Sequence, residues 1–145
     1  MTLKARVSHV RAMPPGAYIS YRLTYQTREN TRIAILPLGY ADGLPRALSN
    51  RGQALIGGRR YPIVGVICMD QAMVNVGNAN VQIGDEAVFI GRQGEDEITI
   101  TELVDLIDGT SSNEIACRIS QRLPRVYLRQ GHPAYINHGY LPAAE

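Results

Sequence analysis

Two tyrosines near the start of the chain have side chains that could take part in proton transfer. Tyr21 and Tyr25 lie in residues 19–25 (ISYRLTY), where their even spacing places both rings on one face of an extended segment. A phenol can donate or accept a proton, although it ordinarily titrates at about pH 10. A pair of packed aromatic rings is the plainer interpretation, because tyrosine is common in strands. Spacing alone therefore leaves catalysis and packing both open.

Two loops further along the chain place polar groups at the ends of apolar strands. Residues 37–43 (PLGYADG) end in Asp-Gly, which favours a tight turn that leaves Tyr40 near the rim of the domain. Residues 63–71 (IVGVICMDQ) run an apolar strand directly into the carboxylate of Asp70. Binding residues concentrate on such loops, so both are candidates to line a site. Equally, Tyr40 could cap the core, Met69 could fill it, and Asp70 could be an ordinary turn former.

Asn113 lies near the start of a predicted helix. Ser111 and Glu114 have the spacing of a capping box, and an N-terminal turn presents unpaired N–H groups to phosphate or carboxylate. Serines at such a position more often only cap the helix. Four arginines follow at near-helical spacing, but Pro124 interrupts any continuous helix through them, so they indicate a solvated or interface face. These arginines are Arg118, Arg122, Arg125 and Arg129.

The elements that must position these residues are mostly strands. Turn residues recur roughly every eight to twelve residues between β-branched stretches. Gly57-Gly58 predicts a two-residue hairpin loop, and two short helices are expected, at about 101–107 and from near Ser112 to before Pro124. Strand and helix do not alternate, so we predict a small β-barrel or sandwich with one or two short helices. The expected strands are 5–11, 17–25, 31–38, 53–56, 59–68, 72–76, 86–90 and 123–128.

Length and composition favour a single domain. A chain of 145 residues with 45% hydrophobic content can bury its own core, which we place in residues 1–130. Residues 131–145 lose the periodic pattern and are predicted to be an irregular tail. A balance of 15 basic against 13 acidic residues gives a net charge of +2, far from the positive field of a nucleic-acid-binding surface. The acidic run 95–97 is expected to be only solvated.

Other compositional features narrow the chemistry. The apolar runs are too short to span a membrane, so no membrane role is expected. The two cysteines belong to no metal-ligand pattern, which favours a reduced, cytoplasmic protein without a metal site. Lys4 is the only lysine among the 15 basic residues. Chemistry that requires a buried lysine is therefore poorly supported by this chain.

Seven short fragments, taken in order, resemble the C-terminal β domain of alanine racemase. Each fragment is weak alone, but their order and fitting gaps make the combination specific. The resemblance covers about residues 3–128. The fragments are 20–21 (SY), 37–43 (PLGYADG), 63–65 (IVG), 68–71 (CMDQ), 83–85 (IGD), 113–114 (NE) and 124–126 (PRV).

This resemblance implies the interconversion of L- and D-alanine, which supplies D-alanine for peptidoglycan. Members of the family hold pyridoxal phosphate covalently on a lysine of an N-terminal α/β barrel domain, and the β domain of the other subunit of a homodimer completes the shared active site. The chain resembles only that C-terminal part, so it is expected to be inactive alone. The implied mechanism is two-base proton transfer at the α-carbon of a small amino-acid substrate.

The resemblance also assigns roles to residues. Tyr21 corresponds to the catalytic base of the β domain, and the backbone N–H of Met69 corresponds to the donor that holds the substrate carboxylate. Tyr40 and Asp70 resemble residues that line the access corridor. Asn113 stands where many members place a tyrosine that contacts the cofactor phosphate.

Three positions depart from the common family pattern. Arg22 replaces a usual glycine, Val66 replaces a frequent arginine, and Asn113 replaces the tyrosine just mentioned. Loss of an aromatic gate should widen the passage, so a racemase of broader specificity is one alternative. A β-barrel interaction module without catalytic function is the other.

Overall fold

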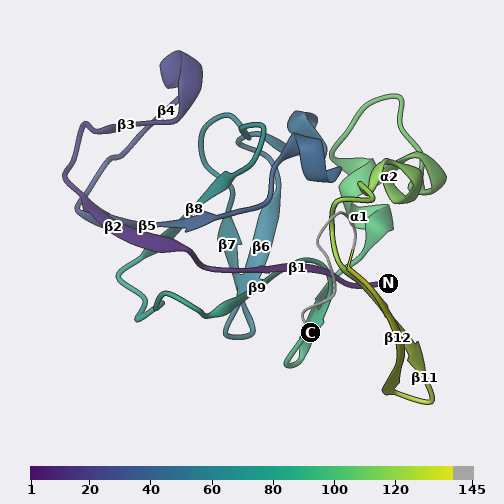
Figure 1. Cartoon of the computed structure of the whole chain (residues 1–145). Helices are drawn as coiled ribbons and strands as arrows, with labels where there is room; N and C mark the ends of the chain where they lie inside the picture. The colour runs from purple at the N-terminus through teal and green to yellow at the C-terminus, as the bar shows by residue number, and fades with distance from the viewer. Residues whose placement is uncertain (139–145) are drawn as a thin grey trace.

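The computed structural model describes residues 1–138, which form a mostly β domain with two short helices (Figure 1), as predicted. The larger sheet is antiparallel with strand order β1-β9-β6-β7, and β10 pairs with β9. The smaller sheet has the order β2-β5-β8. The larger sheet contains β1 (Leu3–Arg6), β6 (Gln53–Ile56), β7 (Arg59–Pro62), β9 (Glu86–Gln93) and β10 (Asp96–Ile98), and the smaller contains β2 (His9–Met13), β5 (Thr31–Leu36) and β8 (Ala72–Gly77).

A single main core is shared by the two sheets and the helices. Leu55 and Phe89 come from the larger sheet, and Leu36 comes from the smaller. The helices α1 (Ile100–Asp105) and α2 (Ser112–Arg118) add the buried side chains Leu103 and Ile115. None of the helices in residues 1–138 is long and apolar enough to cross a membrane.

A second, smaller core lies on the opposite face of the β2-β5-β8 sheet. Successive side chains of a strand point to opposite faces, so Ala34 and Leu36 join the main core while Ile33 joins the second one. Ile19 of the short strand β3 (Tyr18–Ile19) packs there, beside Tyr25 of β4 (Tyr25–Gln26). These strands belong to an arm, residues 17–27, that extends from the body in Figure 1. The second core anchors this arm to the sheet.

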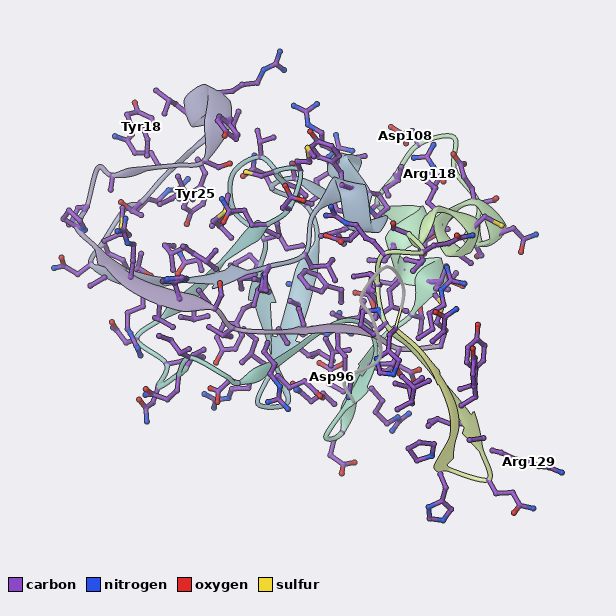
Figure 2. All side chains as sticks on the ribbon, viewed as in Figure 1. Tyr18, Tyr25, Asp96, Asp108, Arg118 and Arg129 are labelled. Carbon is purple, nitrogen blue, oxygen red and sulfur yellow. The ribbon has the colours of Figure 1, made fainter. Side chains whose placement is uncertain are left out.

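The predicted strand 17–25 is wrong, because the chain turns sharply at Ser20. Its φ is 67° with ψ −177°, and a 3₁₀ turn follows at Tyr21–Leu23. Tyr21 and Tyr25 therefore do not share a strand face. The Tyr25 hydroxyl accepts a hydrogen bond from Asn75 Nδ2 at 2.9 Å, and in Figure 2 its ring lies between the arm and the body of the domain.

Two more predicted strands are shorter than expected for local reasons. The strand 59–68 ends at Pro62, after which Ile63 makes only an isolated bridge, and Gly65 turns the chain with a φ of 75°. The strand 5–11 is divided between β1 and β2, which lie in different sheets. By contrast, the hairpin at Gly57-Gly58 is confirmed, with both residues at positive φ.

The prediction of irregular structure after residue 130 is wrong for His132–Asn137, which form the strand β12. This strand pairs antiparallel with β11 (Arg125–Arg129), and Arg129 marks the tip of the resulting hairpin in Figure 2. Gln130 and Gly131 form its two-residue loop with φ values of 53° and 79°. This is the positive-φ pattern that tight hairpin loops require. Residues 139–145 of the predicted tail lie outside the described part of the chain.

Arg60 ties β7 to β10 and α1. Its Nε and Nη2 donate to the Asp96 carboxylate at 2.8 and 2.9 Å, and it also forms an ion pair with Glu102. The acidic run 95–97 is therefore not merely solvated as expected. The guanidinium of Arg60 holds the pKa of Asp96 below its ordinary value.

We expect Arg60→Met to weaken the fold in a pH-dependent way. A lowered folded-state pKa stabilises the protein above the unfolded-state pKa of about 3.9, and that stabilisation is lost as the pH falls through the lower folded-state value. The melting temperature of the variant should therefore fall below wild type at neutral pH, and the gap should shrink below about pH 4. Thermal unfolding followed by circular dichroism measures both.

Arg92→Met is the matched control. Arg92 makes an exposed ion pair with Glu97, which should contribute little at any pH. A gap between Arg60→Met and wild type that stayed constant into strong acid would contradict the role assigned to Asp96.

Candidate active site

One cleft of about 770 Å³ brings together four of the five predicted site residues. They come from three separate segments of the chain. These are the arm, residues 39–43, which we call the glycine loop, and residues 68–71, which we call the methionine loop. Asn113 does not line this cleft. The four residues are Tyr21, Tyr40, Met69 and Asp70.

Tyr21 points its ring out of the domain. The residue is 70% exposed, and its hydroxyl has no hydrogen-bond partner within residues 1–138. The preceding Ser20 donates from its hydroxyl to the Val66 carbonyl at 2.6 Å, which ties the turn to the segment entering the methionine loop. A Cβ on Gly65 would lie 2.6 Å from the Ile19 carbonyl oxygen, so glycine is required for this close approach.

The glycine loop and the methionine loop are joined backbone to backbone. The amides of Tyr40 and Ala41 donate to the carbonyls of Cys68 and Met69, both at 3.0 Å. A Cβ on Gly39 would lie only 2.3 Å from the Cys68 carbonyl oxygen. The position of Tyr40 relative to Met69 is therefore fixed by main-chain contacts that leave no room for a side chain at residue 39.

Met69 lines the cleft and carries an unpaired main-chain donor. Its own backbone N–H makes no hydrogen bond within the described part of the chain, although the Cys68 amide closes the loop by donating to the Gln71 carbonyl at 2.9 Å. An unpaired N–H at the surface of a cleft can donate a hydrogen bond to an anionic group such as a carboxylate. The Met69 side chain is largely exposed and contributes little to the core.

Arg122 bridges two carboxylates at the edge of this arrangement. Its Nε donates to Asp42 Oδ1 at 2.7 Å, and its Nη2 donates to Asp70 Oδ1 at 2.6 Å. The Asp42 side chain is only 6% exposed, and its other oxygen accepts from the Gly39 amide at 2.7 Å. The hydrogen bonds to the two carboxylates raise the pKa of Arg122, and the one to Asp42 has the larger effect.

Sequence reasoning missed this bridge. The sequence predicts a solvated or interface face for Arg122 and a tight turn at Asp42-Gly43. The single aspartates near the ends of residues 37–43 and 63–71 were the available signal, because two carboxylates near one another favour a cation between them. Nothing in the sequence specified which of the arginines would supply it.

Asn113 is exposed in the first turn of α2 and is not among the residues that line the cleft. The predicted capping contact is confirmed, since Ser111 Oγ accepts from the Glu114 amide at 3.2 Å. Lys4 is also absent from the cleft lining and forms an ion pair with Glu86 at 2.7 Å. The cleft of this chain therefore contains no lysine.

Comparison with known proteins agrees with this arrangement of residues. Residues 1–127 match the family described as "Alanine racemase, C-terminal domain". The chain belongs to this family. It is 56% identical over 128 residues to the alanine racemase of Symbiobacterium thermophilum, which covers 88% of this chain and 34% of that protein. The chain thus spans about a third of the length of the curated relatives it matches.

Solved structures give the same family. The crystal structure of alanine racemase from Bacillus anthracis with bound L-Ala-P superposes with a TM-score of 0.87 at 38% identity, over 93% of this chain and 34% of that one. Alanine racemase of Clostridium difficile 630 in complex with cycloserine gives a TM-score of 0.85 at 38% identity, over 97% and 36% of the two chains. The similarity to this C-terminal domain extends over the arm and both loops.

We expect Gly39→Ala to separate the two loops. The φ of Gly39 is −136°, which any residue adopts, so the penalty comes from the clash with Cys68 alone. Overpacking of this kind should lower the free energy of unfolding by about 2–3 kcal/mol. Gly52→Ala is the control, because its added Cβ meets side chains at 3.1 Å and should cost less. Urea denaturation that gave equal losses for the two variants would rule out the tight contact.

Arg22→Gly should have the opposite effect on stability. Arg22 has a φ of 62°, which glycine adopts freely and other residues adopt at a cost. After subtraction of the entropy that glycine adds to the unfolded chain, a gain of about 0.5–1 kcal/mol is expected. Arg28→Gly, at an exposed position without positive φ, should lose stability by a similar amount. Two changes of the same sign in urea denaturation would contradict a strained Arg22.

Proposed function

We propose that this chain is the C-terminal domain of a pyridoxal-phosphate-dependent alanine racemase, which interconverts L- and D-alanine. The observation that carries the proposal is the pairing, in one cleft, of the exposed and unpartnered Tyr21 hydroxyl with the free backbone N–H of Met69. A proton-transfer group and a hydrogen-bond donor for the substrate carboxylate are two of the elements that a racemase needs near the α-carbon of an amino acid. Family membership supports the same assignment.

Racemisation removes a proton from one face of the α-carbon and returns a proton to the other. In our proposal Tyr21 serves one face and a lysine of the N-terminal α/β barrel domain serves the other. We propose that groups outside this chain assist the proton exchange at the Tyr21 hydroxyl. Its lack of an internal partner leaves it available to those groups.

The residues of this chain fit part of the surroundings of pyridoxal phosphate. When bound, that cofactor supplies an electron sink for the α-carbon. No lysine lines the cleft, so the covalent attachment must come from the N-terminal barrel domain. Asn113 is proposed to donate its amide to the cofactor phosphate, because it is exposed in the first turn of α2 and has N–H groups to offer.

The remaining candidates are assigned to binding and access. The Met69 N–H holds the substrate carboxylate, which fixes the orientation of the α-carbon toward Tyr21. Tyr40 and Asp70 line the access corridor, consistent with their exposed positions on the rim of the cleft. Small amino acids are the substrates that this arrangement favours.

Exposed apolar side chains surround the cleft and support a second subunit as its cover. Tyr18 and Leu23 on the arm, and Tyr40 and Met69 on the loops, are all exposed in the isolated domain. Clustered exposed apolar groups of this kind mark interfaces. We therefore propose a homodimer in which this face meets the barrel domain of the partner. Both cysteines are unpaired, which fits a cytoplasmic location.

The experiment is Tyr21→Phe in the full-length protein that carries this chain. Loss of a general acid–base group should lower kcat/KM by about 10²–10⁴-fold in both directions. Tyr135→Phe is the matched control, since Tyr135 is an exposed tyrosine of β12 that does not line the cleft, and it should stay near wild type. Rates measured from L- and from D-alanine provide the test, and wild-type rates for Tyr21→Phe in both directions would refute the assignment.

A further inference from the structure

Arg122 is placed to control the charge and the shape of the cleft without lining it. It lies 52 residues beyond Asp70 and 80 beyond Asp42, after the end of α2, yet it reaches both carboxylates. The Ser120 amide, two residues before it, donates to the Asp42 carbonyl at 3.0 Å and fastens this segment to the glycine loop. This main-chain hydrogen bond therefore holds Arg122 at the edge of the cleft.

The two ion pairs of Arg122 differ in kind. Asp42 is buried and needs a cation and the Gly39 amide to compensate its charge. The side chain of Asp70 is 61% exposed, and water would solvate it without any partner. An exposed pair of this sort adds little to stability, so the fold alone gives no reason for the second contact. The neighbour of Asp70 in the methionine loop supplies a different reason for this contact.

Asp70 adjoins Met69, a residue of the cleft lining whose backbone N–H makes no hydrogen bond within residues 1–138. An uncompensated carboxylate at this place would repel an incoming anion and would also compete for the N–H of its own loop. Arg122 draws the Asp70 carboxylate toward Asp42 and offsets its charge. The Met69 N–H then remains available to a carboxylate ligand.

We propose that Arg122 is a positioning residue that holds the methionine loop open to the carboxylate of an amino acid by pinning Asp70. This inference rests on the proposed function and deepens it, because it names a residue that sets substrate affinity without touching substrate. Arg122 acts through Asp70, so its effect depends on the charge of that side chain. A lysine cannot replace it fully, since a single ammonium group lacks the planar fork that serves two carboxylates at once.

Kinetics of the full-length protein test the charge effect. Arg122→Gln should raise KM for alanine by about tenfold, as expected for one unscreened charge near the ligand, with kcat changed by less than about threefold. Adding Asp70→Asn to that variant should lower KM most of the way back to the wild-type value. The KM of Arg122→Lys should lie between those of wild type and Arg122→Gln. Arg92→Gln, which removes an exposed arginine elsewhere, should leave both constants unchanged.

NMR relaxation on the 15N-labelled 145-residue chain tests the positioning independently of activity. The amide order parameters of Met69 and Asp70 should fall in Arg122→Gln from rigid values of about 0.85 toward about 0.6, and should stay high in Arg92→Gln. Thermal unfolding of the same samples shows that each variant is folded. If Arg122→Gln does not fold, Arg122→Lys replaces it in both measurements, with smaller changes of the same sign.

The outcomes separate the two proposals. Ordered Met69 and Asp70 amides in Arg122→Gln, an unchanged KM for that variant, or a raised KM that Asp70→Asn does not relieve, would overturn the positioning role. A wild-type full-length protein that does not racemise alanine would overturn the proposed function, and the order parameters would still decide whether Arg122 positions the loop.

Discussion

The cleft depends on a main-chain contact between two loops that are distant in sequence. The glycine loop lies so close to the methionine loop that residue 39 has no room for a Cβ, and two amides of the first donate to carbonyls of the second. Hydrogen bonds between backbones leave side chains and one N–H free for other uses. Tyr40 and the Met69 N–H owe their relative placement to this contact, and Arg122 reinforces it from outside.

The arm adds the third component by a different physical route. A small apolar cluster on the outer face of the β2-β5-β8 sheet holds Ile19, while the hydroxyl of Ser20 ties the following turn to Val66. The positive φ of Ser20 and Arg22 is local strain that these contacts sustain. As a result Tyr21 is fixed by its backbone and unconstrained at its hydroxyl. In the proposed function, the remainder of the chemistry is then left to another domain.

Local signals in the sequence predicted the local structure well. Gly57-Gly58, the Ser111 cap and the mostly β pattern depend on residues close together in the chain, and all three are confirmed. The break at Ser20 was not predictable from local propensity, because Val66 and Gly65 impose it from 46 and 45 residues away. The Arg122 bridge likewise spans 80 residues. The order of motifs nominated the cleft residues, but only the fold shows that four of them meet.

A crystal structure of the full-length protein with a bound alanine analogue would measure the relation on which the proposed chemistry depends, the distance from the Tyr21 hydroxyl to the α-carbon. With the hydroxyl at about 3–3.5 Å from that carbon, and the Met69 N–H directed at the carboxylate, the geometry would be that of a proton-transfer site. A Tyr21 hydroxyl turned to solvent or into its own domain, with the analogue bound elsewhere, would contradict the assignment of this domain to racemisation.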